Sequence, residues 1–322
     1  MFKSNLGVVD KDCANLANNS VADMKVEPIT AEEEYMKNPD LKKEEIAELK
    51  KWMKTQPHLP QNVTDEQLIL FHHSCYYDMD ATKACIEVYY TTRTNTPEFF
   101  GNRDILRPEL QHALKVLHYN CLPVKDPNGY QIIYHKLQQF EAGKYTFNDG
   151  VKVLSMAIDA CLSVEGTVPG YIFLFDMKGV RLGHLTRLSI SSLRKFFLYL
   201  QEGMPVRLKA IHVLNTHSLI DKILMLVRPF MKKELMKMIH FHTDLQPVYE
   251  ALSTKCLQKE YGGELESIDE LHEKFESWMK SLRPYFKDEE KFRNDEKKRI
   301  TDKKGKHAYQ EQDLSLQNLC ID

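Results

Sequence analysis

The sequence predicts an α/β fold with a mostly parallel sheet, preceded by a small all-α unit. Between about residues 131 and 231, short β-rich runs alternate with helical runs, as in parallel strands joined by crossover helices. Between about residues 40 and 92, three amphipathic helical patterns follow one another instead. At 322 residues the chain is long enough for one large domain and a small one.

The predicted helical unit contains three segments with helix-start signals. Asp40 can cap the segment LKKEEIAELKKWM, which has an apolar face at helical spacing. Thr64 and Gln67 can form a capping box ahead of LILF, and Asp80 precedes the amphipathic ATKACIEVYY. Residues 1 to about 30 are rich in Asn, Asp and Lys without periodicity, so we expect a disordered lead there.

The α/β region is predicted from segments that alternate along the chain. The predicted strands are QIIYHKL (131–137), GYIFLFDM (170–177) and RLKAIHVL (207–214). The predicted helices are DGVKVLSMAIDACLSV (149–164), LSISSLRKFFLYL (188–200), LIDKILMLVRPFM (219–231) and IDELHEKFESWMKSL (268–282). Beyond Pro284 the chain carries mixed charge and few apolar residues, which predicts a solvated, mobile tail.

Composition and cysteine usage narrow the class of protein. The net charge of −2 gives no global attraction to nucleic acid or membranes, so an anion site has to be a local patch. The 7 cysteines are scattered without a C-x-x-C pair, as in proteins with reduced, intracellular thiols. Because neither a signal peptide nor a run of about 20 apolar residues is visible, we expect a cytoplasmic protein.

The sequence lacks the motifs of several enzyme and cofactor-binding classes. It has no G-x-S-x-G elbow, no H-E-x-x-H helix and no Gly-rich phosphate-binding fingerprint between strand and helix. His240 and His242 could share one side of a strand, but a metal site needs further ligands and none stands at a suggestive spacing. We therefore predict a protein that is not an enzyme, with no catalytic residues, metal or cofactor.

Two local patterns favour a binding function. Residues 207–242 contain seven Lys or Arg against two acids, and Arg207 and Lys209 would project from one side of a strand. Their separation of roughly 7 Å suits two phosphates of one headgroup, although a solvated strand end is an equal alternative. The 219–231 segment has a broad apolar face, which indicates either a core-packing crossover helix or a lid that closes on a lipid beside an anionic membrane.

The segments FDMKG, KAIHVLN, RPF and EYGG, in this order and spacing, resemble the CRAL-TRIO lipid-binding family. The resemblance runs from about Leu41 to Ile268 and is closest to its α-tocopherol transfer protein-like and clavesin-like group, with VYYTTRTNTPEFFGNRD similar to an arthropod branch. It implies a cage of mostly parallel strands under a gate helix near 215–231. The expected divisions are a lead (1–30), an N-terminal helical domain (31–95), a lipid-binding domain (96–268), and a C-terminal helix with a mobile charged tail (269–322).

The resemblance also implies site residues. Arg207 and Lys209 match a basic pair that contacts inositol phosphates in the family, and Lys233 and Lys237 would add to it. Other basic positions of the family are occupied here by Cys75, Glu234 and Met238. The candidate lipid-pocket residues, for each of which core packing is the alternative role, are Tyr134, Tyr171, Phe173, Phe175, Phe196, Tyr199, Leu200, Ile211, Leu224 and Val227.

The expected function follows from the family. It is the binding of a small hydrophobic lipid of the tocopherol, retinoid or carotenoid type, and its transfer between membranes that display phosphatidylinositol bisphosphate. The aromatic character of the candidate pocket favours a flat or long polyene. A phosphatidylinositol or other phospholipid transfer protein is the alternative within the family, and a lipid-modifying enzyme or a scaffold protein is the alternative from other classes.

Overall fold

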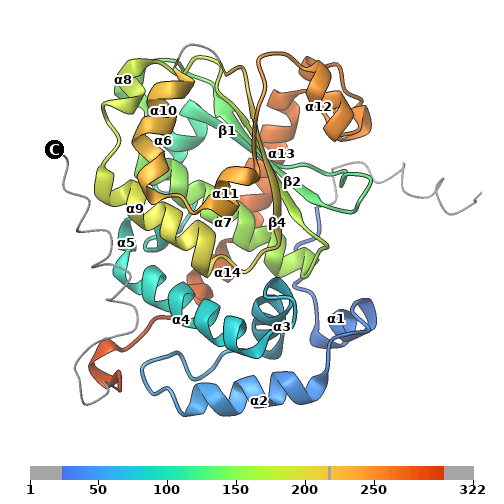
Figure 1. Ribbon diagram of the computed structural model, residues 1–322, viewed down its shortest axis with the longest axis vertical. Coiled ribbons are helices and arrows are strands. Elements are labelled where there is room, and N and C mark those ends of the chain that lie inside the picture. Colours follow the sequence, from blue (N-terminus) through green and yellow to red (C-terminus); the bar gives the residue numbers. More distant parts are fainter. Residues whose placement is uncertain (1–23, 217–218, 301–322) are drawn as a thin grey trace, which may run out of the picture.

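The computed structural model describes residues 24–216 and 219–300. A helical unit lies at one end of the molecule and a sheet flanked by helices forms the rest (Figure 1). The sheet has five strands in the order β1-β2-β3-β4-β5. β1 pairs antiparallel with β2, and the other neighbours are parallel. This confirms the predicted α/β class with its mostly parallel sheet and preceding helices.

The helical unit contains the three predicted helices and one more. Its helices are α1 (Ala31–Lys37), α2 (Lys43–Lys54), α3 (Asp65–Ser74) and α4 (Met79–Asn95). The capping box of Thr64 and Gln67 is present at α3. Asp78 rather than Asp80 caps α4, since its carboxylate accepts a hydrogen bond from the Ala81 amide. A second capping box, formed by Thr30 and Glu33, begins the short α1 that the sequence analysis missed.

The α/β region contains all three predicted strands and two that were missed. The strands are β1 (Leu117–Cys121), β2 (Gln131–Leu137), β3 (Tyr171–Asp176), β4 (Leu208–Leu214) and β5 (Ile239–Phe241). Its α-helices are α5 (Pro97–Phe100), α6 (Pro108–Val116), α7 (Phe147–Glu165), α8 (Leu182–Leu185), α9 (Ile190–Leu198), α10 (Ile220–Val227), α11 (Lys233–Lys237), α12 (Gln246–Ala251), α13 (Ile268–Ser281) and α14 (Arg283–Glu289). A π-helical turn (Tyr199–Gly203) extends α9, and short 3₁₀ turns lie at Ala142–Lys144, Arg228–Phe230, Thr254–Cys256, Lys259–Tyr261 and Glu296–Lys298.

The two faces of the sheet have separate apolar cores. On one face, side chains such as Phe173 and Ile211 pack in the large core that includes α7 and α9. On the other face, Ile172 and Leu174 pack in a smaller core with residues of α12 and the start of α13. Successive strand residues alternate between the two cores, as the pleat requires.

The two glycines of the EYGG segment make a turn that other residues would not fit. Gly262 has a φ of +70°, in the left-handed region that favours glycine. A Cβ on Gly263 would lie 2.0 Å from the Leu257 carbonyl oxygen. The turn is tied to the sheet because the Tyr261 hydroxyl donates to Asp176 Oδ2 at the end of β3, at 2.5 Å.

The segment after Pro284 was expected to be a solvated tail, and for residues 285–300 this is wrong. α14 brings Glu289, 4% exposed, into a fully buried cluster with Arg93, Arg103 and Asp159. Each guanidinium pairs with both carboxylates, so these four charges balance, and every ion has at least two partners because Arg293 also lies 3.5 Å from Glu289. It joins α4, α7, α14 and the loop that follows α5. Residues 301–322 lie outside the described part of the chain.

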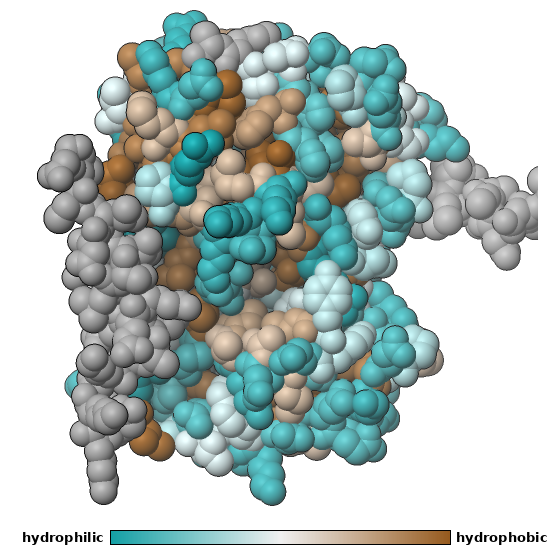
Figure 2. Space-filling model, in the orientation of Figure 1, coloured by the Kyte–Doolittle hydropathy of each residue, from teal (hydrophilic) through white to brown (hydrophobic). Residues whose placement is uncertain are grey.

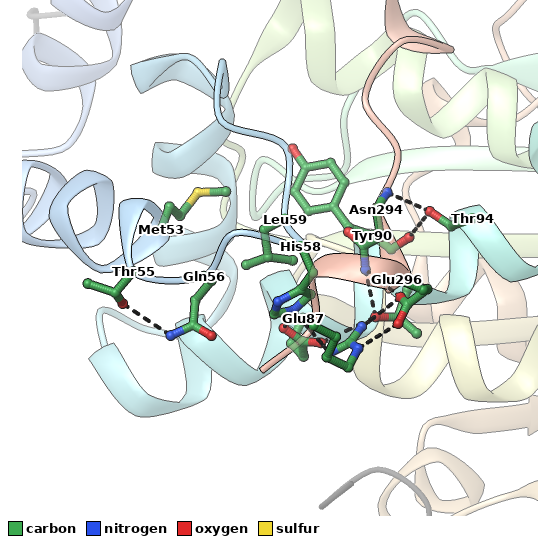
Figure 3. Close-up of polar contacts among 12 residues, drawn as sticks. Met53, Thr55, Gln56, His58, Leu59, Glu87, Tyr90, Thr94, Asn294 and Glu296 are labelled. Carbon is green, nitrogen blue, oxygen red and sulfur yellow. Dashed lines mark hydrogen bonds and ion pairs between the residues drawn. The ribbon is translucent and has the colours of Figure 1, made fainter. Parts of the chain in front are cut away.

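The segment after α14 also attaches to the helical unit (Figure 3). The Asn294 amide donates to Thr94 Oγ1 on α4 at 2.8 Å. His58 Nε2 lies 2.9 Å from Glu87 Oε2, and Arg299 pairs with the same carboxylate. Residues 294–299 thus pack against α4 and the loop that follows α2.

Part of the predicted disordered lead is packed. The Ile29 amide donates to the Ser163 carbonyl on α7 at 3.0 Å, and Trp278 Nε1 donates to the Lys25 carbonyl at 2.9 Å. Residues 24–30 therefore lie against α7 and α13. Residues 1–23, the remainder of that lead, are outside the described residues.

The buried cluster predicts a large effect of removing one charge. Replacing Glu289 with Gln keeps the side-chain size but leaves the two guanidinium groups with one buried carboxylate. We expect the free energy of unfolding to fall by about 3–5 kcal/mol, measured by urea denaturation. Asp104→Asn is the control, because it breaks the exposed pair of Asp104 with Arg283 and should cost much less. Equal losses in the two variants would contradict a structural role for the cluster.

Candidate ligand cavity and basic patch

A cavity of about 190 Å³ lies on the large-core face of the sheet, beneath α10. Its lining is almost entirely apolar and comes from β1, β2, the β3 end, α8, α9 and α10: Leu117, His135, Leu137, Tyr145, Phe147, Asp176, Met177, Val180, His184, Leu185, Leu188, Leu193, Phe196, Phe197, Ile223 and Val227. A second cavity of about 500 Å³ lies at the carboxyl ends of β3 and β4. Both cavities are lined by Asp176, Met177, Val180 and Ile223, so they adjoin under one helix.

Helix α10 covers these cavities and is only partly buried, with Leu226 and Val227 packed against the large core. Six of its eight residues are apolar, yet none of the eight is buried. Ile223 and Val227 face the smaller cavity, whereas Met225 is 74% exposed. Figure 2 shows apolar surface around α10 on this face of the molecule. An apolar helix that is only partly buried loses fewer packing contacts when it moves than a core helix would. This suits a cover over a ligand.

Two histidines interrupt the apolar lining of the smaller cavity. His135 projects from β2, with its ring 5.1 Å from the rings of Tyr119 and Phe175. Burial lowers the pKa of His135 from 6.5 to about 4, against an upward pull from the Asp176 carboxylate. Burial also lowers the pKa of His184, which is 3% exposed and lies on α8. Both imidazoles are therefore neutral at physiological pH.

Arg207 and Lys209 lie side by side at the start of β4, against the loop between α3 and α4. Arg207 Nε donates to the His73 carbonyl at 2.8 Å, and its guanidinium lies 4.2 Å from the centre of the Tyr76 ring. Lys209 Nζ donates to the Tyr76 hydroxyl at 3.0 Å. Tyr76 has a φ of 54° and is 61% exposed, so a left-handed turn holds an aromatic ring over both cations. We call Arg207, Lys209 and Tyr76 the basic patch.

The helix α11 adds exposed cations near the same end of the sheet. Lys233 and Lys237 are exposed, and α11 leads directly into β5, which pairs with β4. The Ile211 amide donates to the Met238 carbonyl at 2.8 Å, so the end of α11 lies beside the middle of β4. The predicted basic residues are thus on adjoining elements.

Comparison with known families identifies most of this region. The family described as CRAL/TRIO domain matches residues 116–263, which include the sheet, α10 and the basic patch cations. Residues 116–263 form a CRAL/TRIO domain. The preceding residues 38–110 match a family described as Pinta-like, UBA domain.

Relatives of known name match both parts of the chain. The human protein "Alpha-tocopherol transfer protein-like" is 26% identical over 243 residues, 74% of this chain and 70% of its own. "Clavesin-2" of Rattus norvegicus is 25% identical over 245 residues, 73% of each chain. A solved structure, "Crystal structure of Sfh5", has a TM-score of 0.48 and 14% identity, and the match covers 71% of this chain and 90% of that chain.

The predicted pocket residues occupy different places in the CRAL/TRIO domain. Phe196 and Val227 line the smaller cavity, and Phe173 stacks on Phe175 on the same face, with ring centres 5.8 Å apart. Tyr134 lies on the opposite face, where its hydroxyl is 2.7 Å from the Tyr261 hydroxyl. Four others belong to the large core without lining either cavity: Tyr171, Tyr199, Leu200 and Ile211. Leu224 is half-buried on α10 and lines neither cavity.

Several lining residues of the CRAL/TRIO domain were missed by the sequence analysis. They come mainly from the connection between β3 and α9, which includes Val180, His184 and Leu188. The signal was weak, because this connection contains the four-residue α8 and no sustained periodicity. His135 could have been found, because it is a polar residue inside the otherwise apolar predicted strand 131–137.

The histidines of β4 and of the β5 region pair with one another. His212 Nδ1 lies 2.9 Å from His242 Nε2, and the His212 ring stacks on His240 with centres 5.1 Å apart. Among the residues that the structure describes, no group of three or more His, Cys, Asp or Glu side chains is arranged to hold a metal ion. No helix of the described ranges is long and apolar enough to cross a bilayer.

The burial of His135 predicts a pH dependence. Since the pKa of His135 in the folded protein, about 4, lies below the ordinary value of 6.5, its contribution to stability is complete above pH 6.5 and decreases as the pH falls toward 4. In an NMR titration, the His135 imidazole should remain unprotonated until the pH approaches 4. The His135→Asn variant assigns the resonance, and a midpoint near 6.5 would contradict the burial of this ring.

Proposed function

We propose that this protein carries a small hydrophobic lipid of the isoprenoid type, such as a tocopherol, retinoid or carotenoid, and transfers it between membranes. The observation that carries the proposal is the apolar, only partly buried α10 lying over two adjoining cavities in a CRAL/TRIO domain. One relative is named "Alpha-tocopherol transfer protein-like", which agrees with this class of cargo.

The combined size of the two cavities and the apolar lining of the smaller one support a neutral lipid as cargo. The two cavities measure about 190 and 500 Å³ and fall, taken together, within the range of ligand pockets, about 300–1,000 Å³. Burial of about 400 Å² of apolar ligand surface would contribute on the order of 10 kcal/mol before the costs of binding. Contact with the ligand would also bury the apolar side of α10. Cargo and cover would then stabilise each other without any covalent chemistry, so the proposed protein is not an enzyme.

We place membrane recognition at the basic patch and α11. Arg207 and Lys209 lie close enough to engage one multiply phosphorylated headgroup, and Arg can do so bidentately. Tyr76 lies over both cations, so an inositol phosphate would have to displace or stack on its ring. Lys233 and Lys237 would extend the surface toward phosphatidylinositol bisphosphate. In this account the protein is cytoplasmic, binds the membrane transiently and releases its lipid there.

If the protein carries a lipid in this cavity, a side chain that fills the cavity should weaken lipid binding. Ile223 lines both cavities, so Ile223→Trp should exclude a retinoid and weaken retinol binding about tenfold or more. Retinol fluorescence on titration measures this affinity. Met225→Trp on the exposed side of the same helix is the control and should bind retinol as the wild type does. Equal binding by all three proteins would exclude the cavity beneath α10 as the lipid site.

If the basic patch recognises the membrane, removing its cations should weaken vesicle binding without affecting lipid loading. The double variant Arg207→Ala, Lys209→Ala should bind vesicles with phosphatidylinositol bisphosphate about tenfold more weakly, because charge-assisted hydrogen bonds are lost. Flotation measures this binding, and retinol loading should be unchanged. The matched control is Lys51→Ala, Lys54→Ala, which removes two exposed cations from α2. If both double variants float as the wild type does, the basic patch is not the membrane contact.

A further inference from the structure

We propose that His184, assisted by His135, selects a lipid that ends in one uncharged oxygen group, a hydroxyl or a carbonyl. This inference rests on the proposed carriage of a lipid and assigns the polar end of that lipid to the smaller cavity. It follows from the hydrogen-bonding state of the two imidazoles and from the charges around them.

His184 offers a hydrogen-bond donor that has no acceptor. Its Nδ1 lies 3.0 Å from the Arg181 amide nitrogen and 3.3 Å from the Arg181 carbonyl oxygen, and the shorter contact, in which the amide donates, requires an unprotonated Nδ1. In the neutral ring the proton is therefore on Nε2. This Nε2 is buried and has no hydrogen-bond partner among the described residues. A buried donor without a partner costs free energy, so a ligand oxygen that accepts from Nε2–H would recover it.

His135 adds a second unsatisfied nitrogen to the lining of the same cavity. Its Nδ1 is also buried without a partner in the part of the chain that the structure describes. Its neighbours Tyr119 and Phe175 contact the ring through their aromatic faces and edges. A hydroxyl can accept from His184 and donate to His135, whereas a carbonyl oxygen can accept alone. Both imidazoles therefore bring an unsatisfied nitrogen to the lining of the cavity that would hold the polar end of the lipid.

The charges that line the smaller cavity disfavour an anionic group at this end, and Arg181 and Arg187, which act on His184, lie outside that lining. The lining includes no Lys or Arg, and its one carboxylate, Asp176, already accepts from Asn215, Tyr261 and the Lys178 amide. A phosphate or carboxylate placed here would be a buried anion without a cation. The neutral imidazoles cannot supply the missing charge. An alcohol, aldehyde or ketone of an apolar chain is the ligand class that remains.

The test compares two probes that share an apolar skeleton. Geranylgeraniol carries a terminal hydroxyl, and the corresponding hydrocarbon lacks it. We expect the wild-type protein to bind the alcohol about tenfold more tightly than the hydrocarbon. His184→Phe should lose this preference while still binding the hydrocarbon, which shows that the variant is folded. His184→Gln should retain it, because the Gln amide can donate from a position close to Nε2.

A control variant and three outcomes decide the inference. His112→Phe alters an exposed histidine of α6 outside both cavities and should keep the preference for the alcohol. An undiminished preference in His184→Phe would overturn the assignment of the anchor, and so would tighter binding of the C20 carboxylic acid than of the alcohol by the wild type. If the wild type binds neither the alcohol nor the hydrocarbon, the proposed lipid carriage fails and the anchor fails with it.

Discussion

The buried pairing of Arg93 and Arg103 with Asp159 and Glu289 holds the two halves of this molecule together. These four side chains come from α4, α7, α14 and the loop that follows α5. One cluster therefore joins the helical unit, the main helix on the sheet and α14. Arg93 also lies over the rings of Tyr89 and Phe100, which fixes the guanidinium from its other side. Four buried charges are tolerated because each is paired twice.

The position of the basic patch depends on that junction. The last turn of α3 supplies the His73 carbonyl that accepts from Arg207, and the loop after it supplies the Tyr76 ring that covers Lys209. The helical unit therefore has a functional as well as a structural part in the account. By contrast, α10 has no buried residue and no comparable tie. We therefore expect α10 to move when a ligand enters or leaves, while the helices joined by the buried cluster stay in place.

The sequence could predict elements whose pattern is local. β2, β3 and β4 are apolar runs, and α2, α3 and α4 have helical periodicity with start signals, so both sets were found. β1 was missed because LHYNC carries polar residues, although all five are buried. His118 and Asn120 are buried in it, and His118 packs on His272 of α13, a contact about 150 residues away in sequence. The packing of Glu289 was missed for the same reason, since a charge run gives no indication of its distant partners.

The candidate site was predicted in part. The basic pair was found because both residues belong to one strand, whereas Tyr76 comes from another unit. Aromatic residues alone could not identify the pocket, because the register of β2 and β3 pairs Tyr134 with Leu174 and so places Tyr134 on the face away from Phe173. The cavity depends instead on the irregular connection before α9, whose lining residues have no sequence periodicity.

Native mass spectrometry of the purified full-length protein, followed by extraction of any bound lipid, tests the central claim most directly. The account predicts a non-covalent, phosphorus-free lipid with an isoprenoid skeleton and an uncharged oxygen group. Ile223→Trp should be purified without it. A phospholipid in the wild-type protein, or a wild-type protein whose cavity is empty after gentle purification, would contradict the account.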